Sequence, residues 1–369
     1  MGTIPTASTE ARRLGRRGND KAHGQAPALP AMFDRYREYL EDALAASVPP
    51  LEDHPVNALL RYHLGWSDQT GAPAVTPSSQ GKALRPTLCM FACDALQGDP
   101  RHAAPAAAAL ELIHNFSLVH DDIQDQGMER RHQPTVWAVW GTEQALVAGD
   151  AMQSLGDLSS LGVAGGVPPA TAIKVSQLLT QSYLEMIEGQ CRDLEFERRD
   201  SIESQEYLAM IALKTGALIR SSTVIGATIA TEGAETLEGV ARFGRAIGRL
   251  FQIRDDYLGI WGDEAITGKS TDSDIVQRKK SYPIVYAFQN ADGARREELL
   301  RLYSRDTLDE DDVNLVLQIL DDLGADRQTD ELTEATAEEG RAALAMLELP
   351  PWAAEDAANL IDFMAYRLF

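Results

Sequence analysis

The sequence predicts an all-α fold, a single-domain helical bundle, and three observations support this. Apolar residues recur three and four positions apart along most of the chain, which is the period of an amphipathic helix. Alternating runs rich in β-branched residues, which would indicate strands, are almost absent. Ala and Leu abound while aromatic residues make up only 7% of the 369 residues, a balance that favours helices.

The chain divides into two segments of different character. Residues 1–30 are rich in Gly, Pro, Arg and Ala, so we expect a disordered tail there. Residues 31–369 show helix after helix without a repeat or a convincing linker, so we expect one domain. Helices are expected near 32–47, 57–66, 84–98, 103–127, 142–161, 169–196, 204–231, 235–260, 281–291, 310–323, 330–347 and 352–367.

The breaks between these helices follow ordinary stop signals. Gly98-Asp99-Pro100 ends one long apolar stretch, and Gly127 lies just beyond the last carboxylate of the next. The stretch "SDQTGAPAVTPSSQG" (67–81) has the composition of a loop. The predicted bundle therefore has helices joined mostly by short connections.

Charge and cysteine content exclude several classes of protein. A net charge of −22 argues against nucleic acid or an anionic membrane as the main partner. No apolar run reaches the ~20 residues that a membrane span requires, and the N-terminus lacks the apolar segment of a secretory signal. Three cysteines without a zinc pattern suggest a reducing compartment, so we expect a cytoplasmic protein.

The segment "HDDIQD" (120–125) places three carboxylates in an otherwise apolar helix. Asp121, Asp122 and Asp125 are spaced so that they crowd one side of an ideal helix. A solvated acidic face is one interpretation, but the preceding "LELIHNFSLV" is apolar on nearly all sides, as in a buried helix. Buried carboxylates need cations, and oxygen ligands suit Mg²⁺, which completes its shell with water and phosphate.

A second acidic segment, "LFQIRDDYLGIWGD" (250–263), carries Asp255 and Asp256 in a helix of the same character. Two such segments could face each other across a bundle and hold metal ions between them. Basic residues flank both segments, at Lys82, Arg85, Arg130, Arg131, Lys214, Lys269, Lys279 and Lys280. Each is an ordinary surface charge by itself, but together they indicate a polyphosphate site with Mg²⁺ on one side and Arg and Lys on the other.

In this order the motifs resemble those of the trans-isoprenyl diphosphate synthases, the polyprenyl synthetase family. The resemblance covers roughly residues 55–369 and implies a helical bundle of the isoprenoid synthase type with a central active-site cavity. It rests on "GKALRP", "HDDIQD" followed by "RR", "GQCRDL", "KTGAL", "FQIRDDYLG", "GDEAITGK" and "DIVQRKKSYP". So many motifs in order are far more specific than one DDxxD.

The resemblance implies a homodimeric, Mg²⁺-dependent prenyltransferase, with three metal ions, that condenses isopentenyl diphosphate with an allylic diphosphate. The implied Mg²⁺ ligands are Asp121, Asp122, Asp125, Asp255 and Asp256. The implied contacts of the allylic diphosphate are Arg130, Lys214 and Lys269, and those of isopentenyl diphosphate are Lys82, Arg85, His114 and Arg131. Thr215, Gln190, Asp193, Gln252 and Lys279 match further active-site positions.

Four features depart from the family pattern. Gly259 stands where the second aspartate motif usually has its third carboxylate, so we expect the third metal ion to be held less securely. Ala83 stands where a second basic residue is common, and His132 where Gly is common. The "SYP" after Lys280 replaces the usual "TLP". None of these changes removes an essential charge.

Product length is tied in this family to the residues just before the first aspartate motif, here Phe116 and Ser117. Helical spacing places Ser117 about 40° from Asp121, which supports Ser117 as a wall of the pocket. The role of Phe116, about 140° away, rests on the resemblance alone. An aromatic residue followed by a small one favours geranylgeranyl over farnesyl diphosphate as the product.

Two alternatives remain open. A class I terpene cyclase shares the helices and the aspartate motifs but needs no site for isopentenyl diphosphate, and the basic residues implied for that site argue against it. A non-catalytic subunit of a heteromeric synthase typically loses aspartates from the first motif, and this chain keeps all three.

Overall fold

The computed structural model describes residues 27–50, 54–74, 83–262, 272–305 and 307–368. In these ranges the chain is almost entirely helical. Its two strands there, β1 (Glu129–Arg130) and β2 (Gln133–Pro134), pair in one short antiparallel hairpin. The predicted all-α class is confirmed, whereas the predicted tail lies mostly outside the described residues and the domain boundary stays a prediction.

The described helices, with a 3₁₀ turn η2 at Gly162–Gly165, have the following bounds: α2 (Met32–Arg35), α3 (Arg37–Ser47), α4 (Pro55–His63), α5 (Leu84–Ala95), α6 (Pro100–Gln124), α7 (Val136–Trp140), α8 (Thr142–Leu161), α9 (Pro169–Glu197), α10 (Ser204–Lys214), α11 (Gly216–Ala230), α12 (Ala234–Trp261), α14 (Ser273–Val276), α15 (Tyr282–Asn290), α16 (Gly293–Tyr303), α17 (Glu310–Leu323), α18 (Ala325–Ala345) and α19 (Pro351–Tyr366).

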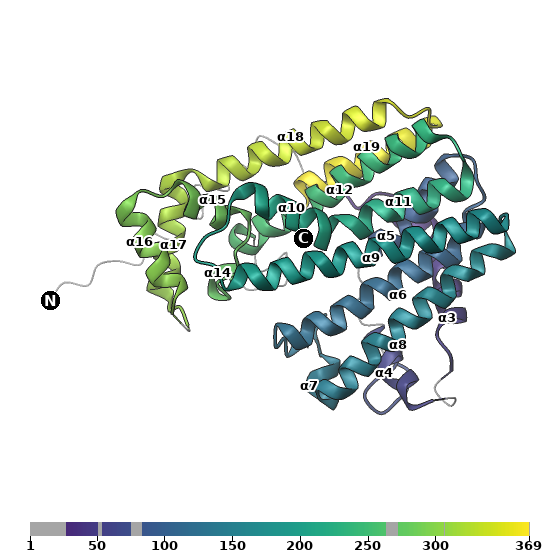
Figure 1. Ribbon diagram of the computed structural model, residues 1–369, viewed down its shortest axis with the longest axis horizontal. Coiled ribbons are helices and arrows are strands. Elements are labelled where there is room, and N and C mark those ends of the chain that lie inside the picture. The colour runs from purple at the N-terminus through teal and green to yellow at the C-terminus, as the bar shows by residue number, and fades with distance from the viewer. Residues whose placement is uncertain (1–26, 51–53, 75–82, 263–271, 306, 369) are drawn as a thin grey trace.

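The long helices lie side by side in a layered bundle. Figure 1 shows α9, α11, α12 and α18 running roughly parallel across the molecule, with α6 and α8 beyond α9, and each neighbouring pair in this series is in contact. The short helices α14, α15, α16 and α17 gather at one end of the bundle. The aspartate motifs therefore lie on α6 and α12, two long helices that are separated by α9 and α11.

Helix α6 is buried on nearly all sides, as its composition predicted. Asp99 caps its N-terminus by accepting the Arg101 N–H at 2.9 Å, and Pro100 occupies the first turn, where no intrahelical donor is needed. A run of buried alanines then lets neighbouring helices approach closely, and the Gly127 N–H bonds the Asp122 carbonyl at the C-terminal end. The helix thus carries "HDDIQD" out of the core in its last turn.

Two expected helices are divided in the structure. The segment 32–47 breaks at Tyr36, and the segment 204–231 breaks at Thr215 into α10 and α11, which are bent by 45°. At this bend the backbone of Lys214 presses on α9, since a Cβ on Gly189 would lie 2.2 Å from the Lys214 nitrogen. Apolar periodicity continues across both breaks, so it could not reveal them. The elements that periodicity missed are short or polar: α7, α14, α16 and the hairpin.

Among the described residues, no single helix is long and apolar enough to cross a membrane, and only the bent pair α10 and α11 passes that test together.

Candidate active site

The first aspartate motif contains carboxylates in three different environments. Asp125 is exposed, Asp121 is half-buried, and Asp122 is buried. One oxygen of Asp122 accepts a hydrogen bond from Arg130 Nε at 2.9 Å, and Arg130 Nη2 lies 2.8 Å from the same oxygen in the ion pair. Arg130 belongs to β1, so this ion pair fastens the hairpin to the end of α6. Asp121 and Asp125 remain as the pair that faces outward from the helix end.

Asp121 is in an unusual electrostatic position. Burial raises its pKa to about 6, the negative charges of Asp125 and Asp193 act in the same direction, and Lys214 and Arg130 oppose them. An added cation would stabilise the ionised form of such a carboxylate, because positive charge offsets both its desolvation and its repulsion from neighbouring carboxylates. The site therefore favours a cation at Asp121.

Lys214 ends α10 directly opposite the first motif. Its ammonium contacts Asp193 of α9 at 2.5 Å, and it acts electrostatically on Asp121 as well. The next residue, Thr215, donates its hydroxyl to the Gln252 side-chain carbonyl at 2.7 Å. The bend between α10 and α11 thus aims Lys214 at α6 and α9 and ties Thr215 to α12.

Asp256 in the second aspartate motif is completely buried and makes three hydrogen bonds. Its oxygens accept from the Tyr207 hydroxyl at 2.5 Å, the Tyr282 backbone N–H at 3.0 Å and the Gln252 amide at 2.9 Å. Burial raises its pKa to about 6, while Lys279 and these hydrogen bonds oppose the rise. Both oxygens are therefore engaged by the protein itself, whereas the Asp255 side chain is 35% exposed and lies 3.8 Å from Arg367.

Lys279 connects the second motif to α9. Burial would lower the pKa of its ammonium, but Asp274, Asp256, Asp255 and Asp193 outweigh that effect and raise it. Asp193 acts electrostatically on both Asp121 and Lys279, so the Asp193–Lys214 pair lies close to both aspartate motifs. That the two motifs face each other across a metal site stays a prediction.

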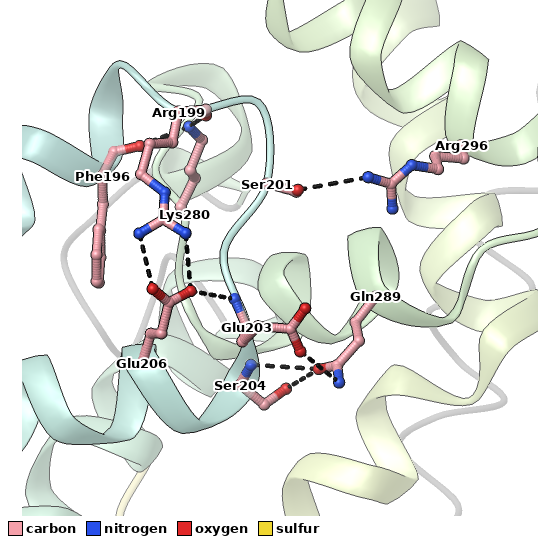
Figure 2. Close-up of polar contacts among 9 residues, drawn as sticks. All are labelled: Phe196, Arg199, Ser201, Glu203, Ser204, Glu206, Lys280, Gln289 and Arg296. Atoms are coloured by element: carbon pink, nitrogen blue, oxygen red, sulfur yellow. Dashed lines mark hydrogen bonds and ion pairs between the residues drawn. The ribbon is translucent and has the colours of Figure 1, made fainter.

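Figure 2 shows how the end of α9 is held in place. The Lys280 ammonium donates to the Phe196 carbonyl at 2.7 Å and to the Arg199 carbonyl. Outside that view, it also lies 3.3 Å from the Glu197 carbonyl. A cation at this end of a helix also complements the helix dipole. The sequence predicted Lys280 only as one of several flanking charges. In the structure it fixes its own segment, which also contains Lys279, against the end of α9.

The loop from α9 to α10 is held by side chains in the same view. Arg199 donates to both carboxylate oxygens of Glu206, each at 2.8 Å, and Gln289 of α15 accepts from the Ser204 hydroxyl at 2.6 Å. Arg296 of α16 reaches Ser201 at 3.4 Å. These contacts brace α10, and with it Lys214, against the short helices at the end of the bundle.

A basic pocket lies on the other side of the Asp122–Arg130 pair. Arg85 of α5 is 8% exposed, and burial lowers its pKa to about 10 although Glu111 opposes this. Burial, followed by Arg85 and Arg131, lowers the pKa of His114 well below its usual value. The pocket therefore contains the guanidinium groups of Arg85 and Arg131 beside the His114 imidazole, and Glu111 is the carboxylate that acts on both arginines.

His63 of α4 belongs to the same pocket, and sequence reasoning missed it. Burial, Arg131 and Arg130 lower its pKa to about 3. It lines a polar cavity of about 10 Å³, room for about one water molecule, together with Asp122, Arg130 and Arg131. A lone His in an apolar helix carries no signal of its own, because only the packing of α4 against the hairpin brings it there.

The remaining predicted residues line the contact between α6 and α9. The Gln190 amide donates to the Gln124 carbonyl at 2.7 Å. The Phe116 ring is 5% exposed and packs edge-on against Tyr183, with ring centroids 6.5 Å apart, and the Ser117 hydroxyl donates to the His114 carbonyl. Lys82 and Lys269 lie outside the described residues.

The donor set suits Mg²⁺ bound together with a phosphate ligand. Within the part of the chain that is described, no three His, Cys, Asp or Glu side chains converge into a ready metal cage. Mg²⁺ ordinarily binds proteins through one or two carboxylates and fills its octahedron with water and substrate phosphate. Asp121 with Asp125, and Asp255 opposite, fit that mode.

Comparison with known proteins identifies the family. The family model described as Polyprenyl synthetase matches residues 72–320. The chain belongs to the polyprenyl synthetase family. It is similar over 95% of its length, at 34% identity, to (2E,6E)-farnesyl diphosphate synthase of Mycobacterium tuberculosis, covering 99% of that protein. It is 35% identical to the geranylgeranyl diphosphate synthase of the same organism, over 74% of this chain and 76% of that one.

Solved structures agree with this assignment. A polyprenyl synthetase from Streptomyces coelicolor superimposes with a TM-score of 0.83 at 32% identity, covering 90% of this chain and 98% of the other. A geranylgeranyl pyrophosphate synthetase from Pyrococcus horikoshii gives 0.82 at 31% identity, covering 91% and 98%. As a polyprenyl synthetase the chain is a prenyltransferase, and its family uses a divalent metal ion to bind diphosphate.

Proposed function

We propose that this polyprenyl synthetase condenses isopentenyl diphosphate with an allylic diphosphate to give a short-chain, all-trans prenyl diphosphate, with geranylgeranyl diphosphate favoured. One observation supports the proposal: a cluster of carboxylates with Lys214 lies near a pocket rich in basic side chains. Carboxylates surround the Asp193–Lys214 pair on one side, and Arg85, Arg131 and His114 form the basic pocket on the other. A metal-bound allylic diphosphate fits the first region and a metal-free diphosphate the second.

The carboxylates are assigned different roles. Asp121, Asp125 and Asp255 are the metal ligands, because they are half-buried or exposed at the site. Asp122 and Asp256, which we expected to be ligands, are better suited to anchoring: Arg130 holds the first, and Tyr207, Gln252 and Tyr282 saturate the second. Three Mg²⁺ ions remain part of the proposal, as do contacts of Lys82 and Lys269 with the diphosphates.

The reaction breaks one C–O bond and forms one C–C bond. Bound Mg²⁺ supplies a Lewis acid that neutralises charge on the departing diphosphate. Lys214 adds a fixed positive charge beside the same group, so the C–O electron pair leaves with the diphosphate and an allylic cation remains. The alkene of isopentenyl diphosphate, held by Arg85 and Arg131, attacks that cation. A proton is then lost from the isopentenyl unit to the released diphosphate.

The apolar residues below the motif exclude water. An allylic cation exposed to water would end as an alcohol, and the buried core of α6 around Phe116 removes that route. Thr215 and Gln252 fix the bend that carries Lys214, so the ammonium is in place before the substrate binds. No nucleophilic serine or cysteine is required.

The primary assay combines purified protein, Mg²⁺, isopentenyl diphosphate and each allylic primer in turn, with products identified by chain length. We expect elongated prenyl diphosphates and no turnover without Mg²⁺. Hydrocarbon formed from farnesyl diphosphate alone would instead indicate a terpene cyclase. A pure chain inactive with every primer, and active only when a second synthase subunit is added, would indicate a non-catalytic subunit.

Product length is expected to depend on Phe116. Phe116→Ala removes a buried ring that lies between α6 and Tyr183 of α9, the helix pair that carries Asp121 and Asp193. Removing the ring should deepen the product pocket, so the main product should become longer by one or more isoprene units. Chromatography of the dephosphorylated products measures this, and an unchanged distribution would refute the assignment.

Phe288→Ala is the matched control for that change. Phe288 is also a buried, edge-packed ring, facing Tyr303 at 5.3 Å, but it lies in α15, away from α6 and α9. Both variants should lose about 3–5 kcal/mol of unfolding free energy, and only Phe116→Ala should change product length.

A homodimer is the proposed assembly. Large apolar side chains are exposed along α8 and α9, two helices in contact, at Leu146, Val147, Leu158, Leu161, Ile173, Leu184 and Ile187. An apolar stripe of this extent favours burial against another protein surface. Light scattering should give twice the 40.3 kDa chain mass; a monomer would contradict it. The cytoplasmic location stays a prediction.

A further inference from the structure

Gly259, the position at which the second aspartate motif lacks its third carboxylate, is covered by a carboxylate from another helix. A Cβ on Gly259 would lie 2.5 Å from both Cγ and Oδ2 of Asp274 in α14. Atoms that are not bonded to each other do not approach as closely as 2.5 Å here. Any residue larger than glycine at position 259 would therefore have to move the Asp274 carboxylate. Gly259 and Asp274 are thus a matched pair in space.

Asp274 is also joined to Lys279 in two ways. The Lys279 N–H donates to the Asp274 carbonyl at 2.8 Å, and the Lys279 ammonium lies 3.9 Å from Asp274 Oδ2. Asp274 is only 8% exposed, whereas the Lys279 side chain is 45% exposed. One end of this ion pair is therefore set in the protein, and the other end reaches the carboxylates of α9 and α12.

We propose that Asp274 is a positioning residue for the condensation: its carboxylate occupies the space that Gly259 leaves open on α12 and from there holds the Lys279 ammonium toward Asp255 and Asp193. This inference rests on the proposed function. In this chain α14 supplies the carboxylate that is missing from α12. Glycine is required at position 259 because any side chain there would collide with Asp274.

A lysine needs such a partner because its ammonium is a point charge on four flexible bonds. Without Asp274, Lys279 would sample many positions above the site, and a diphosphate would have to order it on binding. With Asp274 in place, the direction of the charge is fixed in advance. Loss of Asp274 should therefore weaken diphosphate binding more than it slows turnover of bound substrate.

The test compares single and double variants. Gly259→Ala should lower the melting temperature, because displacing the buried Asp274 carboxylate costs more than the gain in helix propensity of about 1 kcal/mol. It should also raise KM for the allylic diphosphate about tenfold by displacing Asp274. Asp274→Ala should give a similar rise in KM, with kcat changed less. Gly259→Asp should be the most defective single variant, because two carboxylates then compete for one space.

The double variant Gly259→Asp/Asp274→Ala decides the matter. It returns one carboxylate to the same space from α12, so it should bind substrate better than either parent variant and recover KM to within about threefold of wild type. Titration of Mg²⁺ and inorganic pyrophosphate by calorimetry should follow the same order without turnover. Two variants are the controls and should match wild type in both assays. One is Gly293→Ala, whose added Cβ meets nothing within 4 Å. The other is Asp312→Asn, which changes a buried acid of α17 that is paired with Arg305.

Two results would overturn the inference. One is a Gly259→Ala variant with wild-type KM and wild-type pyrophosphate affinity. The other is a double variant no better than the worse of its parents while its melting temperature is unchanged. A wild-type protein that makes no product from any primer would refute the proposed function instead, and the pyrophosphate titration would still report on Asp274.

Discussion

Asp121→Asn should lower kcat roughly 10³-fold while leaving the protein folded. Of the three carboxylates in the first motif, Asp121 alone is half-buried, close to Lys214 and without a protein hydrogen bond in the described structure. Replacing it with an amide removes one negative ligand for the metal that stabilises the leaving diphosphate, an effect of several kcal/mol on the barrier. Steady-state kinetics at saturating Mg²⁺ and both substrates measure the change.

The same substitution should make the metal-free protein more stable at pH 7. Burial raises the pKa of Asp121 from 3.8 to about 6, so its stabilising contribution is present below pH 4 and is lost as pH rises through 6. Asparagine has no such loss. At pH 7 the variant should therefore melt about 1–3 °C higher than wild type. At pH 4 the two proteins should have the same melting temperature. A lower melting temperature at pH 7 would contradict the assignment of Asp121 as a desolvated ligand.

Asp256→Ala should cost about 3 kcal/mol of unfolding free energy. The substitution leaves three donors, from Tyr207, Gln252 and Tyr282, without their acceptor in a fully buried place. Urea denaturation followed by circular dichroism measures it. Activity should fall too, because Gln252 holds Thr215 beside Lys214.

The neighbouring Asp255→Ala is the matched control. Asp255 is on the same turn of α12 but is partly exposed, so its loss should change the unfolding free energy by less than about 1 kcal/mol. Its loss should still reduce kcat by about 10²-fold if it binds metal. The opposite pattern, with Asp255→Ala unstable and Asp256→Ala stable, would reverse the two roles.

The long helices and the general composition of the site follow directly from the sequence. Helices of the bundle core keep the 3.6-residue apolar period over many turns, so α8 and α17 begin and end at the expected residues. Two acidic segments with flanking lysines and arginines likewise predicted a metal and diphosphate site. These features depend on local pattern, which a single sequence contains.

The different roles of the aspartates within each motif do not follow from the sequence. Asp255 and Asp256 are adjacent residues of one type, and they differ only because Tyr207 and Tyr282, each at least 26 positions away, reach Asp256 alone. The bend at Thr215 depends on the close contact between Gly189 and Lys214. The apparent loss at Gly259 looked like a weakened motif until α14 placed a carboxylate there.

The central claim is that Asp121, Asp125 and Asp255 hold metal ions that bind the leaving diphosphate. It is tested most directly by a crystal structure of the protein with Mg²⁺ and an unreactive thiolo analogue of an allylic diphosphate. We predict ions about 2.0–2.1 Å from oxygens of these three carboxylates, the diphosphate against Lys214, and Asp256 still bonded to Tyr207. Metal and diphosphate bound elsewhere, or all three carboxylates turned away from them, would contradict the account.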